Sequence, residues 1–159
     1  MMPYCAKQQA ASSRGVNFVS EAESLATVEK VLFLKSVDLF GGAPIEELGR
    51  IAELTREARF TAGETIYQQG EPVETLYMII QGRVAVKDGA RIIREVGAKQ
   101  GIGILASLGS NVALRTVEAL EPIHALKLGV EDFHDILSSD FELVKAVFRV
   151  VSRNIRAGF

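Results

Sequence analysis

A glycine-rich segment, residues 96–120, contains the groups of this chain that are best suited to bind an anion. Gly101 and Gly103 precede an apolar run, so a short helix starting there would leave the backbone N–H groups of residues 104–106 free. Free N–H groups at a helix start, or in a nest of successive amides, bind phosphate or carboxylate without help from side chains. The spacing therefore allows an anion site built from the backbone.

Catalytic and metal-binding patterns are weak by comparison. A metal site in a β barrel needs two or three clustered histidines with a carboxylate, but this chain has only His124, in a predicted strand, and His134, on a predicted helix about ten residues later. Ser107 and Ser110 lack both a G-x-S-x-G elbow and an identifiable base. Gly101-Ile-Gly103 has no phosphate-loop or dinucleotide fingerprint around it. We therefore expect no enzyme activity and no bound metal.

Composition indicates one soluble globular domain. The chain has 159 residues, a net charge of -2, 48% hydrophobic and 24% charged residues, which predicts no nucleic-acid surface. No run approaches the ~20 apolar residues of a membrane span, and residues 1–19, with the single Cys5, predict a flexible leader rather than a signal peptide. The expected location is the cytoplasm.

Helical periodicity occurs at both ends of the remaining domain, residues 20–159. In the lead-in, residues 20–54, Ser20 and Glu23 have capping-box spacing and predict a helix over 21–35, and Pro44 fits the first position of a second helix. At the other end, residues 130–157 predict two helices.

The last helix is expected to begin at a capping box of Ser139 and Glu142. Its predicted buried stripe consists of Leu143, Val144, Val147, Phe148, Val151 and Ile155. The basic row on its other face consists of Lys145, Arg149, Arg153 and Arg156. We interpret that row as a solvated face, with a docking face for an acidic partner as the alternative.

Between the helices, residues 55–128 change to a period of two, with turn residues every seven to twelve positions. The clearest hairpin signal is Asp88-Gly89. This rhythm predicts a β sandwich or barrel. The runs with strand character are TREARF, ETIYQQ, TLYMII, RVAVK, ARIIREV, ALRTVEAL and IHALKL.

Residues 96–120 resemble the phosphate-binding cassette of cyclic-nucleotide-binding domains, and we call this segment the cassette. The family pattern reads L-G-P-G-D-x-F-G-E-x-A-L, with an Arg nine residues after the Glu, followed by x-A-T-V. Val96-Gly97, Ile102-Gly103, Ala106 and Thr116-Val117 match it without a gap. Upstream, the family pattern F-x-x-G-E-x-I-x-x-x-G also matches from Phe60 to Gly70. The resemblance extends from about residue 29 to 155.

The two polar ligands of the family cassette are absent. Ile104 stands at the Glu position, where the family binds the ribose hydroxyl, and Ala113 stands at the Arg position, where the family pairs with the phosphate. Neither side chain can make these contacts. Arg115 lies two residues beyond Ala113 and on a strand would point to the same face, so a displaced phosphate contact is the alternative.

The resemblance implies an α+β, mainly β fold: an antiparallel β jelly roll flanked by N-terminal and C-terminal helices. It also implies a non-catalytic regulatory or docking module with little or no binding of cAMP or cGMP. The expected partner is another protein or another domain of a larger protein, with a homodimer left open. We expect no DNA binding, because no helix-turn-helix follows the last helix. The alternative is a sensor that binds an anionic ligand through backbone amides and Arg115. The residues of the degenerate site are Gly101, Ile102, Gly103, Ile104, Leu105, Ala106, Ala113, Leu114, Arg115 and Thr116.

Overall fold

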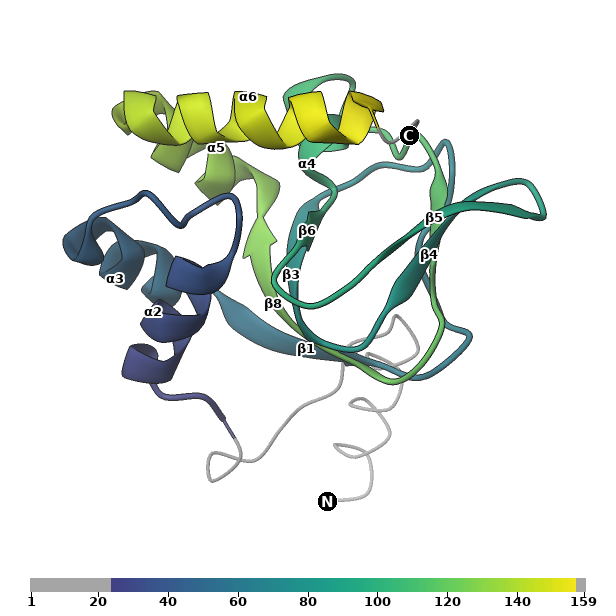
Figure 1. Ribbon diagram of the computed structural model, residues 1–159, viewed down its shortest axis with the longest axis horizontal. Coiled ribbons are helices and arrows are strands. Elements are labelled where there is room, and N and C mark those ends of the chain that lie inside the picture. Colours follow the sequence, from purple (N-terminus) through teal and green to yellow (C-terminus); the bar gives the residue numbers. More distant parts are fainter. Residues whose placement is uncertain (1–23, 157–159) are drawn as a thin grey trace, which may run out of the picture.

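The computed structural model describes residues 24–156, which form a β roll with helices packed beside it and above it in the view of Figure 1. The predicted leader, residues 1–19, and the expected capping pair Ser20 and Glu23 lie outside the described residues. Within residues 24–156, no helix has both the length and the apolar character needed to cross a membrane.

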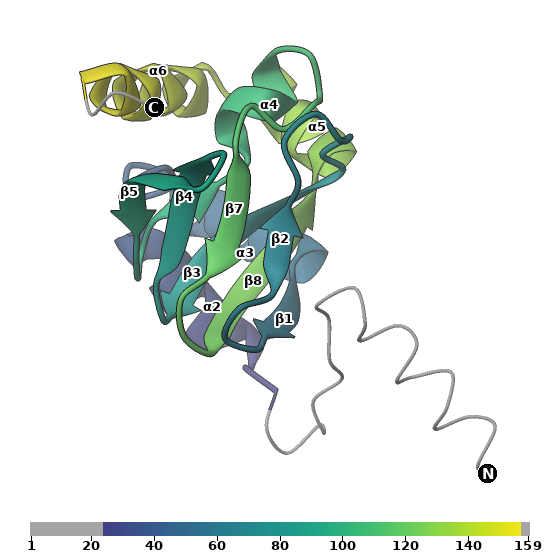
Figure 2. The ribbon, with the colours of Figure 1, turned by 90° about the vertical axis from the view of Figure 1, so that its right-hand side faces the viewer.

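Two four-stranded antiparallel sheets form the roll, in the orders β1-β8-β3-β6 and β2-β7-β4-β5. Figure 2 shows the second sheet in front of the first, with α2 and α3 behind both. The antiparallel roll flanked by helices confirms the predicted fold class. The strands are β1 (Arg56–Phe60), β2 (Thr65–Tyr67), β3 (Thr75–Gln81), β4 (Val84–Asp88), β5 (Arg91–Val96), β6 (Gly101–Ile102), β7 (Thr116–Ala119) and β8 (Ile123–Gly129).

The strand β3 is buried on both faces, which explains its continuous apolar run. Leu76 and Met78 alternate with Tyr77 and Ile79, and all four are buried. One face is covered by α2 and α3, and inside the roll the ring of Tyr77 meets Phe60 edge-on at 5.2 Å between centroids. Because β3 is packed on both faces and pairs with β6, it positions the start of the cassette.

The β4–β5 hairpin forms where predicted, but one residue later than the Asp88-Gly89 signal suggests. Asp88 still pairs with Arg91, so the two loop residues are Gly89 and Ala90. Gly89 has a φ of +63°, whereas Ala90 is not among the described residues with positive φ. A glycine in the first loop position fits a type II′ turn, so the prediction of an Asp-Gly turn was wrong.

Five helices are described: α2 (Thr27–Ser36), α3 (Ile45–Leu54), α4 (Ile104–Leu108), α5 (Val130–Ser139) and α6 (Phe141–Arg156). The first of them begins later than the predicted range 21–35. The N–H of Ala26 donates to Glu29 Oε2 at 3.1 Å, so a carboxylate inside the first turn caps this helix. The predicted start was therefore wrong by about two turns.

The start of α6 also differs from the prediction. Asp140 Oδ1 accepts from the N–H groups of Glu142 at 3.0 Å and Leu143 at 3.3 Å, whereas Ser139 Oγ donates back to the carbonyl of Ile136 at 3.0 Å. The prediction of a Ser139 cap was wrong because Ser139 is the last residue of α5. Asp140 is the better acceptor, since its carboxylate also meets the positive end of the helix dipole.

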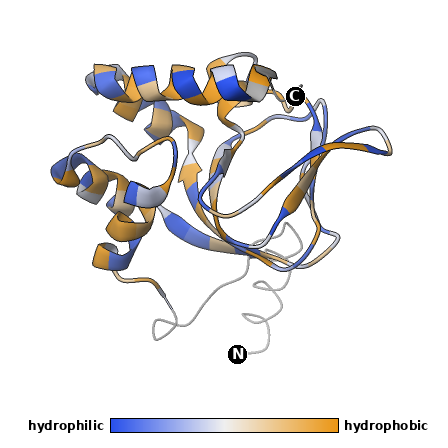
Figure 3. Cartoon of the chain, in the orientation of Figure 1, coloured by the Kyte–Doolittle hydropathy of each residue, from blue (hydrophilic) through white to orange (hydrophobic). Residues whose placement is uncertain are grey.

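The face that α6 buries is rotated from the predicted stripe. Leu143, Ala146 and Val147 are buried, but Phe148 is 67% exposed, so its predicted burial was wrong. Val144 and Val151 are only half-buried. The helix packs through the row that includes Ala146, whose small side chain allows close approach. Figure 3 shows hydrophilic and hydrophobic residues alternating along this helix, and Phe141 and Ile155 are exposed like Phe148.

Two basic residues on α6 pair with carboxylates of the described chain. Lys145 lies 2.8 Å from Glu142, and Arg153 lies 2.9 Å from Asp38, which joins the helix to the segment after α2. These contacts fit the interpretation of a solvated face with local ion pairs.

Candidate functional site

Gly103 determines how the cassette turns from β6 into α4. Its φ is +93°, and a Cβ at this position would lie 2.4 Å from Tyr67 Oη and 3.1 Å from Leu76 Cδ2. No other residue fits both the backbone conformation and the space. The cassette backbone therefore lies directly against Tyr67 and β3.

Tyr67 links the cassette to the strands beneath it through its hydroxyl group. Its hydroxyl donates to the carbonyl of Thr75 at 2.6 Å and lies 3.3 Å from the carbonyl of Ile102. Burial, with a smaller contribution from Tyr77, raises the pKa of Tyr67 well above its ordinary value. Tyr67 is therefore a neutral donor that joins β2, β3 and β6.

The C-terminal end of α4 is bound to α5. His134 Nε2 donates to the carbonyl of Ser107 at 2.6 Å, and Ser107 Oγ donates to the carbonyl of Ile104 at 2.7 Å. These bonds give His134 and Ser107 a structural role and place neither in a catalytic arrangement. No group of three or more metal-ligating side chains occurs among the described residues.

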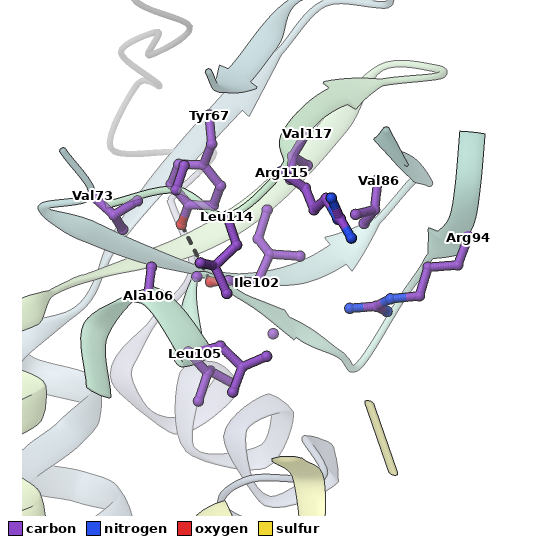
Figure 4. A pocket seen from close by; sticks show the side chains of 14 residues that line it. Tyr67, Val73, Val86, Arg94, Ile102, Leu105, Ala106, Leu114, Arg115 and Val117 are labelled. Carbon is purple, nitrogen blue, oxygen red and sulfur yellow. Dashed lines mark hydrogen bonds between the residues drawn. The ribbon is translucent and has the colours of Figure 1, made fainter. Parts of the chain in front are cut away.

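The cassette encloses a small pocket between α4, β5 and β7, drawn in Figure 4. Its cavity volume is about 80 Å³. All the residues predicted for the site line it except Thr116, whose Oγ1 instead accepts from the N–H of Gln69 at 3.1 Å. The lining residues that sequence reasoning missed are Tyr67, Val73, Val86, Arg94 and Val117.

Ile104 and Ala113 give this pocket an apolar lining. They are only 4% and 5% exposed, and Ile104 Cδ1 lies 3.2 Å from the position that a Cβ on Gly101 would take. The backbone of Ala113 pairs with the turn before β3, donating to the carbonyl of Glu71 at 2.9 Å and accepting from the N–H of Gly70 at 2.9 Å. Of the described residues that line the pocket, none carries a carboxylate.

The free backbone amides expected at the start of α4 occur. Among the described residues, the N–H groups of Ile104, Leu105 and Ala106 have no backbone or side-chain acceptor. However, α4 has only five residues, so few peptide dipoles add up along it. These amides do not by themselves make an anion site.

Arg115 lines the pocket but interacts with the β4–β5 hairpin. Its Nη1 lies 3.6 Å from Asp88 Oδ1, and its side chain is 31% exposed. A contact between Arg115 and a ligand would compete with this carboxylate, which lowers its value as a replacement for the absent cassette arginine.

Arg94 is the second cation of the pocket. It extends from β5 toward the space below Arg115 in Figure 4. Its Nε is buried without a hydrogen-bond partner in the described part of the chain, and burial lowers its pKa. The sequence did contain a signal: Arg94 is two residues from the inward-facing Val96, and strand alternation places them on one face.

A family model described as "Cyclic nucleotide-binding domain" matches residues 57–140. Among curated proteins, an uncharacterized NTE family protein of Mycobacterium tuberculosis is 26% identical over 124 residues, covering 77% of this chain and 21% of that protein. The cAMP-dependent protein kinase regulatory subunit of Debaryomyces hansenii is 27% identical over 115 residues, covering 72% and 25%. The chain thus spans about a quarter or less of the length of these relatives.

Solved structures share the fold. The regulatory subunit of a cAMP-independent protein kinase A from Trypanosoma cruzi, bound to guanosine, superposes with a TM-score of 0.68 at 26% identity and covers 80% of this chain and 45% of that one. The sensor domain of a transcriptional regulator from Pseudomonas aeruginosa gives a TM-score of 0.70 at 16% identity, covering 81% and 90%.

Proposed function

This chain belongs to the cyclic nucleotide-binding domain family, and we propose that within it the chain is a non-catalytic regulatory or docking module with little or no affinity for cAMP or cGMP. The observation that carries the proposal is the burial of Ile104 and Ala113 in the cassette pocket. These are the positions at which the family resemblance places the ribose-binding Glu and the phosphate-binding Arg.

The size and chemistry of the pocket support this proposal. Its cavity of about 80 Å³ is well below the roughly 300 Å³ at which small-molecule sites begin. Each hydrogen bond to a charged group contributes about 1.5–3 kcal/mol, and a sequestered phosphate without its cation costs about 2–5 kcal/mol. Losing both contacts would weaken a micromolar site by ~10³-fold or more, to near millimolar.

The relatives support the regulatory part of the proposal. The Debaryomyces hansenii relative is a kinase regulatory subunit, and that protein is about four times as long as the matched segment. By analogy, the partner of this module is another protein, or another domain of a longer chain. The Trypanosoma cruzi relative is the regulatory subunit of a protein kinase A described as cAMP-independent, so the fold occurs in a kinase that does not depend on cAMP.

Calorimetric titration with cAMP and with cGMP tests the proposal. We expect no binding below about millimolar concentration by the unmodified chain. The double variant Ile104→Glu with Ala113→Arg should gain binding, while neither single variant does, because both contacts act on one ligand. Micromolar binding by the unmodified chain would overturn the proposal.

A matched control separates the site from a general change in charge. Ile92 and Ala62 are exposed, and Ile92→Glu with Ala62→Arg makes the same substitutions away from the pocket. This control should bind neither nucleotide. Circular dichroism should confirm that each variant is folded, and the titration of the unmodified chain decides the question if the double variant is not.

The alternative function is a sensor that binds an anionic ligand through the amides of α4 and Arg115. The observation in its favour is that both groups line the same pocket. If this alternative held, the unmodified chain would bind cAMP or cGMP in the titration, and Arg115→Ala would abolish that binding.

A further inference from the structure

Arg94 is a half-buried cation whose Nε is buried, and among the described residues no carboxylate pairs with it. Its Nε is buried and has no acceptor among the described residues, although native proteins satisfy nearly all buried polar atoms. It lines the cassette pocket on one side and, on the other, a crevice below α6. An unsatisfied guanidinium at the boundary of a pocket needs a physical explanation.

The carboxylates that lie near Arg94 are occupied by other arginines. Glu95, the next residue, pairs with Arg83 at 2.6 Å. Asp38, which lines the crevice below α6, pairs with Arg153 at 2.9 Å. An ion pair with either of these carboxylates therefore does not explain why Arg94 lies here.

The pocket that Arg94 enters selects for negative charge. Among the described residues its lining includes no carboxylate and two guanidinium groups, that of Arg94 and that of Arg115, which also pairs with Asp88 outside the pocket. The rest is largely apolar, so the field of each cation is screened less than in water. A guanidinium fork donates two parallel hydrogen bonds to carboxylate or phosphate, which satisfies a buried Nε together with one terminal nitrogen.

We propose that the cassette pocket binds a small organic oxyanion with a short apolar body, and that Arg94 of β5 donates the bidentate hydrogen bonds to its head. The cavity of about 80 Å³ is roughly half of the ~150 Å³ apolar cavity that accepts benzene. A body of about three or four carbon atoms follows from that comparison. Val86, Leu105 and Leu114 would contact it.

This inference rests on the proposed function, because a pocket closed to cyclic nucleotides is small enough to prefer such a ligand. The new elements are Arg94 as the binding cation and a small oxyanion as the ligand. The two proposals can fail independently, because one is tested by titration with cAMP and the other by titration with a small anion.

The test uses the full chain and three probes: isobutyrate, methyl phosphate and the neutral isostere isobutyramide. Binding is followed by ¹H–¹⁵N NMR at the Nε–H of Arg94 and by calorimetry. We expect isobutyrate or methyl phosphate to shift the Arg94 Nε–H resonance and to bind at least about tenfold more tightly than isobutyramide, because only an anion pairs with the guanidinium. The tighter of the two anions identifies the head group.

Variants decide whether Arg94 is responsible. Arg94→Gln should weaken anion binding by about 10- to 100-fold, the effect of losing a charged hydrogen bond, and Arg94→Lys should restore part of it through charge without the fork. Arg91→Gln, an exposed position on the same strand, should change binding by less than about twofold.

Three results would overturn the inference. One is the same affinity for isobutyrate and isobutyramide, and another is unchanged anion binding in a folded Arg94→Gln variant. The third is the absence of binding by both anions at tens of millimolar. Micromolar cAMP binding would instead remove the proposed function, whatever isobutyrate does.

Discussion

Two charged side chains on strands of this domain have opposite environments. Glu57 of β1 lies 2.7 Å from His124 Nε2 through one carboxylate oxygen, and its other oxygen accepts from the N–H of Leu25. Arg94 of β5 has its Nε buried with no partner in the described part of the chain. Both oxygens of the first charge are paired, across sequence separations of 67 and 32 residues, whereas the Nε of the second has no partner among the described residues.

The difference shows how to distinguish a structural charge from a functional one. Glu57 joins β1, β8 and the start of the lead-in, and its side chain is only 5% exposed, so its hydrogen bonds hold the fold together. The Nε of Arg94 loses hydration on folding without gaining an acceptor in the described part of the chain, so its burial opposes folding. A charged side chain that is desolvated at a pocket without a partner is better explained by a ligand than by the stability of the fold.

The largest expected effect comes from removing the paired charge. Glu57→Leu leaves the His124 ring and the Leu25 N–H without their acceptor, and each buried unsatisfied group costs about 1–3 kcal/mol. Because both hydrogen bonds are only part-buried, urea unfolding should show a loss in the lower part of the summed range, about 2–4 kcal/mol.

Glu53→Leu, at an exposed position of α3, is the control and should change stability by no more than about 0.5 kcal/mol. If both variants had the same small effect, Glu57 would not be the structural charge of this comparison.

An intermediate effect is expected from protonating Glu57. Burial alone would raise the pKa of this carboxyl, but the N–H of Leu25 and the His124 ring together hold it below its ordinary value. A carboxyl with a lowered folded-state pKa stabilises the fold above its unfolded pKa of 4.5, and the contribution disappears as the pH falls through the folded-state pKa.

Urea unfolding of the wild type and of Glu57→Gln at several pH values measures this contribution. The wild type should be more stable by about 1.5–3 kcal/mol at neutral pH, and the difference should shrink below pH 4.5. A difference that is constant or grows on acidification would contradict the assigned direction of the pKa.

The smallest expected effect, of opposite sign, comes from removing the unpaired charge. Arg94→Met keeps a long side chain and removes a desolvated cation, so the free energy of unfolding should stay unchanged or rise by up to about 1 kcal/mol. Arg91→Met should have almost no effect, since Arg91 is exposed. A loss of more than about 1 kcal/mol in Arg94→Met would mean that Arg94 is structural, like Glu57.

Local patterns in the sequence determined the fold class and most of the cassette. The change from helical to alternating periodicity and the regular spacing of turns depend on residues close together in the chain, so they could be recognised without a structure. The family frame around Gly103 could be recognised in the same way. The reason that position 103 is glycine is visible only in the structure, where the hydroxyl of Tyr67 occupies the space that a Cβ would take.

Other features depended on contacts between distant segments, which periodicity does not encode. Helical periodicity places Phe148 on the buried face of α6, but the helix packs through Ala146 and Val147 instead. The surface against which a helix packs determines how the helix is rotated about its axis. The pairing of Glu57 with His124 required the register of β1 with β8. For Arg94, strand alternation with Val96 indicates only that the side chain lies on the inward face of its strand. Only closure of the roll put its guanidinium in an apolar pocket while the nearby carboxylates paired with other arginines.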